Sequence, residues 1–367
     1  MNEDKLKNND SIQKNTLSVF QIAVMTTISV ASLRTLPPMA EEGRASILMY
    51  IIPAILFLVP TSLVSAEFAT TYKGGVYVWI REAFGNRMGF VAIWLQWVQN
   101  VVWYPVQLAF VAAALAFTIN RGDLSNSGLF TAIVIIVVYW FSTFLAFKGG
   151  NLFAKVSSIG GMIGVLIPGA ILIILGLLWV TQGQPISESY LQSSYIPKVT
   201  GISSLVLIVS NVLSYAGMEM NAVHAGQMEN PKKDFTKAIT LAFILILCVF
   251  IFPTLSISMA VPADKLGMAN GIMVAFQEFF EKLNISWMSN VISGAMFFGA
   301  ISSVVTWVAG PSKGLLDAGK TGLLPPILQK VNKNNVQVNI LIFQGIIVTI
   351  LAMIYVLFPD VSDVFIA

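Results

Sequence analysis

Long intervals without a charged residue dominate the pattern of hydrophobic and polar positions along the 367-residue chain. A helix needs about 20 consecutive apolar residues to cross the hydrocarbon core of a bilayer, and nine intervals reach or approach that length. Another apolar segment begins at residue 361. We therefore expect nine complete transmembrane helices and the start of a tenth, so that the chain would be a C-terminally truncated form of a longer fold. The nine intervals are residues 15–33, 45–66, 88–120, 124–147, 156–187, 199–218, 238–263, 283–312 and 334–359.

The first interval runs into a sequence that an uninterrupted helix does not explain. Residues 26–43 read TTISVASLRTLPPMAEEG, with Arg34 shortly before Pro37 and Pro38. Proline lacks a backbone N–H and disfavours helix at the residue before it, which predicts a break near residues 32–36. Free backbone groups at membrane depth are tolerated only inside protein or beside a water-filled cavity. Since an intramembrane charge also marks a functional site, we expect the first helix to be interrupted at such a site.

The sixth interval leads into a second interruption. Its continuation reads SYAGMEMNAVHAG, where Gly217 weakens the helix and Glu219 places a charge near membrane depth. Spans one and six occupy corresponding positions if the chain consists of two five-helix halves of opposite orientation, and paired interruptions of this kind indicate a transporter's binding site. No residue-level repeat supports the symmetry, which rests on topology. The predicted fold is an all-α polytopic membrane protein with a five-plus-five inverted repeat and broken helices 1 and 6.

The distribution of lysine and arginine predicts the orientation of the chain. If the N-terminus is inside, fifteen basic residues lie on the cytoplasmic side, five lie outside, and Arg34 lies within the membrane. Such an excess is typical of cytoplasmic loops. We expect residues 1–16 to form a polar cytoplasmic tail and residues 17–367 to form a single transmembrane domain in the inner membrane of the cell.

Composition excludes several other classes of protein. The chain is 56% hydrophobic and only 11% charged, whereas soluble proteins carry about 25% charged residues. The net charge of +3 does not favour nucleic acid as a partner, and the single cysteine, Cys248, and single histidine, His224, exclude a disulfide framework and a multi-histidine metal site. Neither a phosphate-binding glycine loop nor a catalytic triad is evident. We expect no enzyme activity, no cofactor and no metal, with the lipid bilayer and a small molecule as partners; the oligomeric state stays open.

Three motifs in order resemble the amino acid–polyamine–organocation (APC) transporter superfamily. Residues 67–85 (EFATTYKGGVYVWIREAFG) are similar to its GG-x-Y-x-W…FG signature, and residues 214–235 resemble its sixth helix, with a G-x-E element and a terminal Asn230-Pro231. Residues 310–339 resemble the loop between helices eight and nine in the glutamate:γ-aminobutyrate antiporter branch. The resemblance runs from about residue 17 to the end. It implies amino acid transport by ten core helices in a five-plus-five inverted repeat, with two more helices beyond them.

The sequence departs from that antiporter branch along the implied substrate path. Where the branch carries tyrosine and glutamate after the first break, this chain has Arg34 and Thr35, and it has Ser303 where the branch has an acidic residue in helix eight. The resemblance therefore implies an amino acid substrate more firmly than glutamate and γ-aminobutyrate.

The candidate binding residues lie on spans one, three, six and eight, and each has a competing structural interpretation. A half-helix terminus at the first break favours a substrate carboxylate, but small residues there also allow helix packing. Arg34 could bind an anionic substrate, pair with Glu219 or extend towards the surface, and Glu219 could carry a coupling proton or form a static ion pair. Aromatic residues on span three could stack on substrate or only pack. The candidates are Ser29, Ser32, Leu33, Arg34, Trp97, Asn100, Tyr215, Gly217, Glu219, Ser303 and Trp307.

The sequence thus predicts secondary active transport of amino acids by alternating access, driven by a substrate gradient or by protons. An antiporter is the favoured form, with glutamate:γ-aminobutyrate exchange as its most specific version. Two alternatives remain: a channel-like or substrate-sensing protein on the same scaffold, and a transport-dead fragment.

Overall fold

The computed structural model describes residues 17–72, 75–148, 159–197, 202–220 and 228–357. Within these ranges the chain is helical, and strand-like pairing is limited to one bridge between Val331 and Gln337. The predicted cytoplasmic tail, the start of a tenth span and His224 lie outside the described residues. The all-α fold is confirmed.

Seven helices of the described chain are long and apolar enough to cross a membrane, and one bent pair forms an eighth span. Each overlaps one of the predicted charge-free intervals. The bent pair joins α2 (Val19–Val30) to the Leu33–Glu41 segment, which contains η1 (Leu33–Thr35) and α3 (Leu36–Glu41). The seven are Gly43–Thr71, α7 (Asn86–Thr118), α8 (Gly128–Lys148), Ile159–Thr181, α13 (Pro231–Ala260), α15 (Trp287–Ala318) and Val338–Leu357.

The sixth interval forms a shorter helix, α12 (Ile202–Ser214). Its 13 residues extend about 20 Å, less than the roughly 30 Å of a bilayer's hydrocarbon core. The helix ends before the charge-free interval does, and residues 215–220 form turns. The predicted interruption of the sixth span is therefore present.

Two of the spanning helices contain a π-helical turn followed by a proline. The Gly43–Thr71 helix consists of η2 (Gly43–Ala45), α4 (Ser46–Pro53), the π-turn η3 (Ala54–Leu58) and α5 (Val59–Thr71). The Ile159–Thr181 helix contains the π-turn η5 (Met162–Leu166) and then α10 (Ile167–Thr181). Proline removes a backbone donor and π-turns shift the register of the remaining hydrogen bonds. Both helices can therefore bend, and each can offer carbonyl groups to neighbouring helices.

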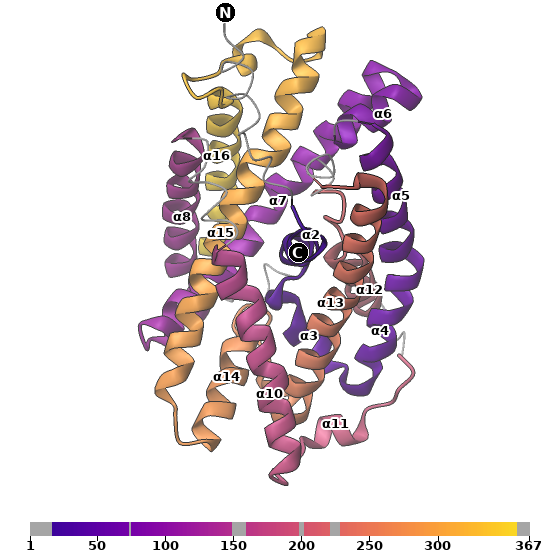
Figure 1. Cartoon of the computed structure of the whole chain (residues 1–367). Coiled ribbons are helices and arrows are strands. Elements are labelled where there is room, and N and C mark those ends of the chain that lie inside the picture. The colour runs from indigo at the N-terminus through magenta and orange to yellow at the C-terminus, as the bar shows by residue number, and fades with distance from the viewer. Residues whose placement is uncertain (1–16, 73–74, 149–158, 198–201, 221–227, 358–367) are drawn as a thin grey trace, which may run out of the picture.

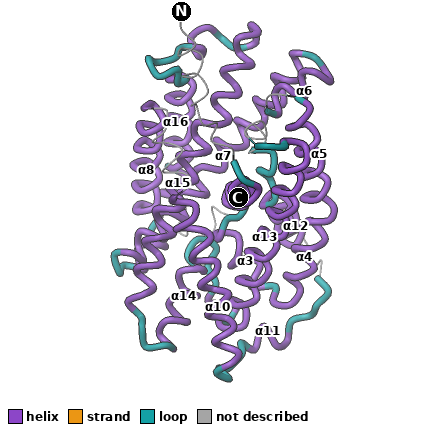
Figure 2. The backbone as a smooth tube through the Cα atoms, in the orientation of Figure 1, coloured by secondary structure: helices purple, strands orange, loops and turns teal. Residues whose placement is uncertain are grey.

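The interrupted first span lies inside the bundle. Figure 1 shows α2 near the centre of the molecule, between α7, α15, α10 and α13. The long helices α7 and α15 pack along each other, and α2 packs against α13. The loops lie mostly at the two ends of the bundle (Figure 2). The remaining elements are α6 (Val76–Phe84), η4 (Gly122–Asn126), α11 (Glu188–Gln192), η7 (Ala263–Lys265), α14 (Gly271–Lys282), η8 (Gly319–Leu323), η9 (Pro326–Gln329), α16 (Val338–Ala352) and α17 (Ile354–Leu357).

Gly161 allows α2 to approach the Ile159–Thr181 helix closely. A Cβ atom on Gly161 would overlap Cγ2 of Ile28. The neighbouring Gly160 makes a similar close approach, because a Cβ atom there would overlap the Ser302 side chain. Small residues at such crossings let helices gain van der Waals contact. This contact matters in a membrane, because lipid tails are as apolar as the side chains and burial of apolar surface therefore does not drive helices together.

Candidate functional site

The first interruption is a short extended segment between two helical segments. Ala31 (φ −69°, ψ 124°) and Ser32 (φ −127°, ψ 120°) are extended, and the segments on either side are bent by 46°. The Ala31 N–H still donates to the Thr27 carbonyl at 2.7 Å. The helix restarts at Leu33, with Pro37 and Pro38 in the first turn of α3, where a missing N–H costs little. The predicted break therefore occurs, but at residues 31–32; residues 33–36, which the prolines were expected to keep out of a helix, are helical.

The second interruption centres on Gly217. Its φ of +114° is a conformation that only glycine adopts readily. The Gly217 N–H donates to Oε2 of Glu219 at 3.2 Å, and its carbonyl accepts from the Met220 N–H at 3.1 Å. The half-buried Glu219 carboxylate thus closes the turn that ends the sixth helix.

The two interruptions meet. A Cβ atom placed on Gly217 would lie 3.4 Å from the Ser29 carbonyl oxygen and 3.6 Å from Cζ2 of Trp307. The Trp307 ring in turn packs against Trp103 of α7, with centroids 6.0 Å apart. The structure therefore brings spans one, three, six and eight together at one point, through three of the predicted residues, Ser29, Gly217 and Trp307. Because Ser29 Oγ donates to the Met25 carbonyl of its own helix at 2.9 Å, it is the Ser29 backbone that faces Gly217.

Other predicted residues on spans three and eight contact the surrounding helices. Trp97 stacks on Phe343 of α16, with centroids 6.1 Å apart. Asn100 Nδ2 donates to the Gln96 carbonyl of the same helix at 2.8 Å. Ser303 is half-buried on α15, one turn before Trp307.

The predicted residues around the first break point in different directions. Leu33 is buried and close to α10, where a Cβ on Gly169 would lie 3.6 Å from Leu33 Cδ2. Ser32 accepts through its carbonyl from the Thr35 hydroxyl at 2.8 Å. Arg34 is half-buried, in the short helical turn that follows the break. Among the described residues, the ion pairs do not include one between Arg34 and Glu219.

Tyr215 points away from the meeting of the two breaks. It is fully buried, and its hydroxyl donates to the Tyr50 carbonyl of α4 at 2.9 Å. Asn211, one turn earlier on α12, donates through Nδ2 to the Met49 carbonyl. Sequence reasoning missed Asn211, although a lone amide side chain in an otherwise apolar interval is a signal that could have indicated it.

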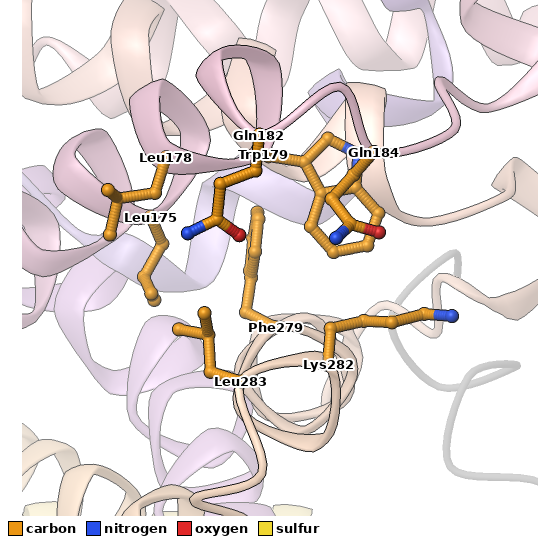
Figure 3. A pocket seen from close by; sticks show the side chains of 8 residues that line it. All are labelled: Leu175, Leu178, Trp179, Gln182, Gln184, Phe279, Lys282 and Leu283. Carbon is orange, nitrogen blue, oxygen red and sulfur yellow. The ribbon is translucent and has the colours of Figure 1, made fainter.

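Two hollows lie near the end of the bundle where α11 and α14 are found (Figure 1), away from the breaks. One is a cavity of about 10 Å³ between α10 and α14, with Trp179 and Phe279 in its wall (Figure 3); it has room for about one water molecule. The other, about 430 Å³, is an open hollow beside Trp287 and Asn290. Neither is lined by a predicted site residue.

Comparison with known proteins identifies the family. The sequence profile described as "Amino acid permease" matches residues 16–366, which is nearly the whole chain. This chain belongs to the amino acid permease family. The family lies within the APC superfamily, so the resemblance inferred from the three motifs is confirmed. The protein is thus a multi-pass membrane transporter of amino acids and not an enzyme.

Relatives of this permease cover most of its length. An uncharacterised transporter from Legionella pneumophila is 39% identical over 351 residues, which are 95% of this chain and 75% of the relative. A glutamate/γ-aminobutyrate antiporter from Lactococcus lactis subsp. cremoris is 31% identical over 91% of this chain and 67% of its own. A probable agmatine/putrescine antiporter from Lactococcus lactis subsp. lactis is 27% identical over 96% of this chain and 74% of its own.

Proposed function

We propose that this permease exchanges amino acids across the cytoplasmic membrane by alternating access, with glutamate:γ-aminobutyrate exchange as the first pair to test. The observation that carries the proposal is the contact of Gly217 with the Ser29 backbone and Trp307, through which two interrupted helices meet inside the bundle. Binding sites of secondary transporters are typically formed by discontinuous helices of this kind. The Lactococcus relative described as a glutamate/γ-aminobutyrate antiporter supports the choice of substrates.

The residues at the meeting point suggest how an amino acid would be held. At the extended segment the Ser32 N–H receives the α-carboxylate and the Ala31 carbonyl receives the amine. The other two backbone groups of these residues already bond Thr27 and Thr35. The rings of Trp103 and Trp307 pack along the substrate side chain. Arg34, next to the break, attracts a second carboxylate.

The proposed orientation places the N-terminus in the cytoplasm, as the excess of basic residues on that side indicates. The end of the bundle with α11 and α14 then faces outward (Figure 1). In this orientation Glu41 and Glu42, at the end of α3, lie on the outer side of the break.

Counterflow in proteoliposomes tests the proposal. Vesicles loaded with unlabelled γ-aminobutyrate should accumulate labelled glutamate, whereas vesicles loaded with buffer should not. Arginine, agmatine, putrescine and neutral amino acids form the comparison panel. Saturable exchange confined to one or two related compounds supports the antiporter and names its substrate. Flux that does not saturate would favour a channel. Binding without counterflow for every compound would favour a sensor, and either result would overturn the exchanger.

We further propose that Glu219 couples exchange to protons, since its carboxylate closes the turn at the sixth break. Glu219→Gln keeps the shape of the side chain and removes its charge. Exchange by this variant should lose the pH dependence that the wild-type protein shows, whereas Glu188→Gln on the exposed helix α11 should keep the wild-type profile. An unchanged pH profile in Glu219→Gln would contradict the role.

A further inference from the structure

Proline at the end of α4 leaves a carbonyl group without its helical donor. Pro53 lies inside the helix and has no N–H, so the carbonyl of Met49, four residues earlier, receives no bond from it. Met49 is buried, and an unsatisfied carbonyl is costly in the protein interior. Asn211 of α12 supplies the missing donor: its side chain is 3% exposed, and Nδ2 donates to the Met49 carbonyl.

Tyr215 binds the next carbonyl of α4. Its hydroxyl donates to the Tyr50 carbonyl at 2.9 Å, while its ring packs against Phe250 of α13 with centroids 5.5 Å apart. Asn211 and Tyr215 are four residues apart, so both side chains extend from one face of the sixth segment. Two consecutive carbonyls at the proline site of α4 are thus bound by two side chains from α12 and the residue that follows it. We call these two hydrogen bonds the α4 anchor.

The α4 anchor fixes the sixth helix immediately before its interruption. Gly217, only two residues after Tyr215, is the residue that meets the Ser29 carbonyl and Trp307. A rotation or shift of α12 relative to α4 would therefore move Gly217 out of this contact. The anchor binds backbone rather than side chains, and neither hydroxyl nor amide is directed at the meeting of the breaks.

We propose that Asn211 and Tyr215 are positioning residues, which hold the sixth break at the place required for substrate binding by anchoring α12 to α4. Asn211 binds the Met49 carbonyl, whose helical donor Pro53 removes. Tyr215 binds the next carbonyl, that of Tyr50, which also accepts from the Ala54 N–H. The inference rests on the proposed transport function. It gives Tyr215 a role different from the substrate contact that the sequence suggested.

A double-mutant cycle tests the anchor without any substrate. Pro53→Ala restores an N–H that can donate to the Met49 carbonyl, so it makes the Asn211 amide unnecessary. Asn211→Leu alone should lower the thermal unfolding midpoint in detergent by about 2 °C or more. In the Pro53→Ala background the same change should lower it by less than half as much. Equal shifts in the two backgrounds would overturn the anchor.

Exchange kinetics test the positioning role. Asn211→Leu should raise the KM for the exchanged amino acid by about five-fold or more, because a misplaced break weakens binding. Adding Pro53→Ala should return the KM towards the wild-type value. A purely structural role would lower Vmax with the amount of folded protein and leave KM unchanged, which would overturn the proposal.

Two tyrosine variants provide a second, independent measurement. Tyr215→Phe removes only the anchoring hydroxyl and should raise the KM. Tyr50→Phe is the matched control, because the Tyr50 hydroxyl bonds Thr254 of α13 at 3.2 Å and takes no part in the anchor. If both raise the KM equally, the positioning role is wrong.

The two proposals fail in different ways. If the wild-type protein exchanges no amino acid, the proposed function fails and the positioning role fails with it. The anchor itself is still established if the unfolding midpoints of the Pro53 and Asn211 variants are not additive.

Discussion

The two interrupted helices differ in what holds each break in place. In the first span the chain is extended for only two residues, Ala31 and Ser32. The helix α3, which has prolines in its first turn, follows closely. In the sixth span no proline lies between Ser214 and Gly217, and the break depends on a glycine at φ +114° and on hydrogen bonds from α12 to α4. The first break is thus encoded locally, and the second is held by a distant helix.

This difference indicates how the two breaks should respond to substitution. A locally encoded break should survive the loss of any one tertiary contact, because its backbone conformation is set by residues beside it. A break held from another helix should be sensitive to changes both at Gly217 and on α4. The following changes test that contrast, beginning with the largest expected effect.

Gly217→Val should cause the largest loss. Valine is strained at φ +114°, and its branched side chain would also crowd the Ser29 carbonyl and Trp307. We expect the variant to be about 2–3 kcal/mol less stable, and its exchange activity to be lost. Thermal unfolding in detergent and counterflow measure the two effects. Gly183→Val is the control, because Gly183 also has positive φ (+65°) but no atom lies within 4 Å of its Cβ position; it should cost about 1 kcal/mol.

Gly161→Val tests the packing of the first interrupted span. The new side chain would overlap Ile28 of α2 and force α2 away from the Ile159–Thr181 helix, which should cost about 1–3 kcal/mol. Because the overlap is with a side chain, Ile28→Ala should restore part of the lost stability. Thermal unfolding of the two single variants and the double variant measures this compensation. Purely additive losses would show that α2 does not depend on this crossing.

Pro37→Ala should have a smaller effect, because the break at Ala31 and Ser32 precedes the proline and alanine fits the first turn of α3. We expect a loss of about 0.4–1 kcal/mol, which reflects the greater freedom of the unfolded chain. The unfolding midpoint measures it. A loss as large as that of Gly217→Val would mean that Pro37 itself maintains the first break, although the proline follows the extended residues.

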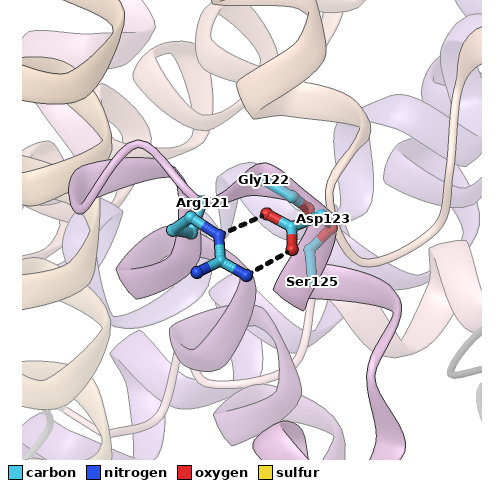
Figure 4. Close-up of polar contacts among 4 residues, drawn as sticks. All are labelled: Arg121, Gly122, Asp123 and Ser125. Atoms are coloured by element: carbon cyan, nitrogen blue, oxygen red, sulfur yellow. Dashed lines mark hydrogen bonds and ion pairs between the residues drawn. The ribbon is translucent and has the colours of Figure 1, made fainter.

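The ion pair between Arg121 and Asp123 should have the smallest effect. Figure 4 shows the guanidinium facing the carboxylate, with bonds of 2.9 and 2.7 Å, but the two side chains are 59% and 62% exposed. Hydrogen bonding to Arg121 lowers the pKa of Asp123. Any stabilisation is therefore present above the ordinary aspartate pKa of about 4 and is lost as the pH falls through the lowered value. Because solvent screens the pair, Asp123→Asn should leave the unfolding midpoint at pH 7 unchanged within error, at low and high salt alike. A clear shift would contradict this.

Much of the fold could be predicted from charge spacing, because a bilayer excludes charges over a fixed thickness whatever the tertiary packing. A break of the first span was predictable from the prolines, but its position was not: Ala31 and Ser32 are extended, whereas the residues directly before Pro37 are helical. The glycine at the sixth break was also identifiable. The direction of Tyr215 was not, since it depends on a carbonyl 165 positions away. The possible pairing of Arg34 with Glu219 could not be decided from the sequence for the same reason, and the described residues show no such pair.

The α4 anchor also has a consequence for how the sequence can vary in evolution. Asn211 and Tyr215 bind main-chain oxygens, which every amino acid carries. Positions 49 and 50 can therefore change identity freely, as far as the anchor is concerned, while positions 53 and 211 cannot change independently of each other. Co-variation between sequences, which detects contacts through matched side chains, should be weak between 49 and 211 and strong between 53 and 211. In such a comparison of sequences, Asn211 would co-vary with the proline that removes a helical hydrogen bond from α4. It would not co-vary with the residue whose carbonyl accepts the Asn211 amide.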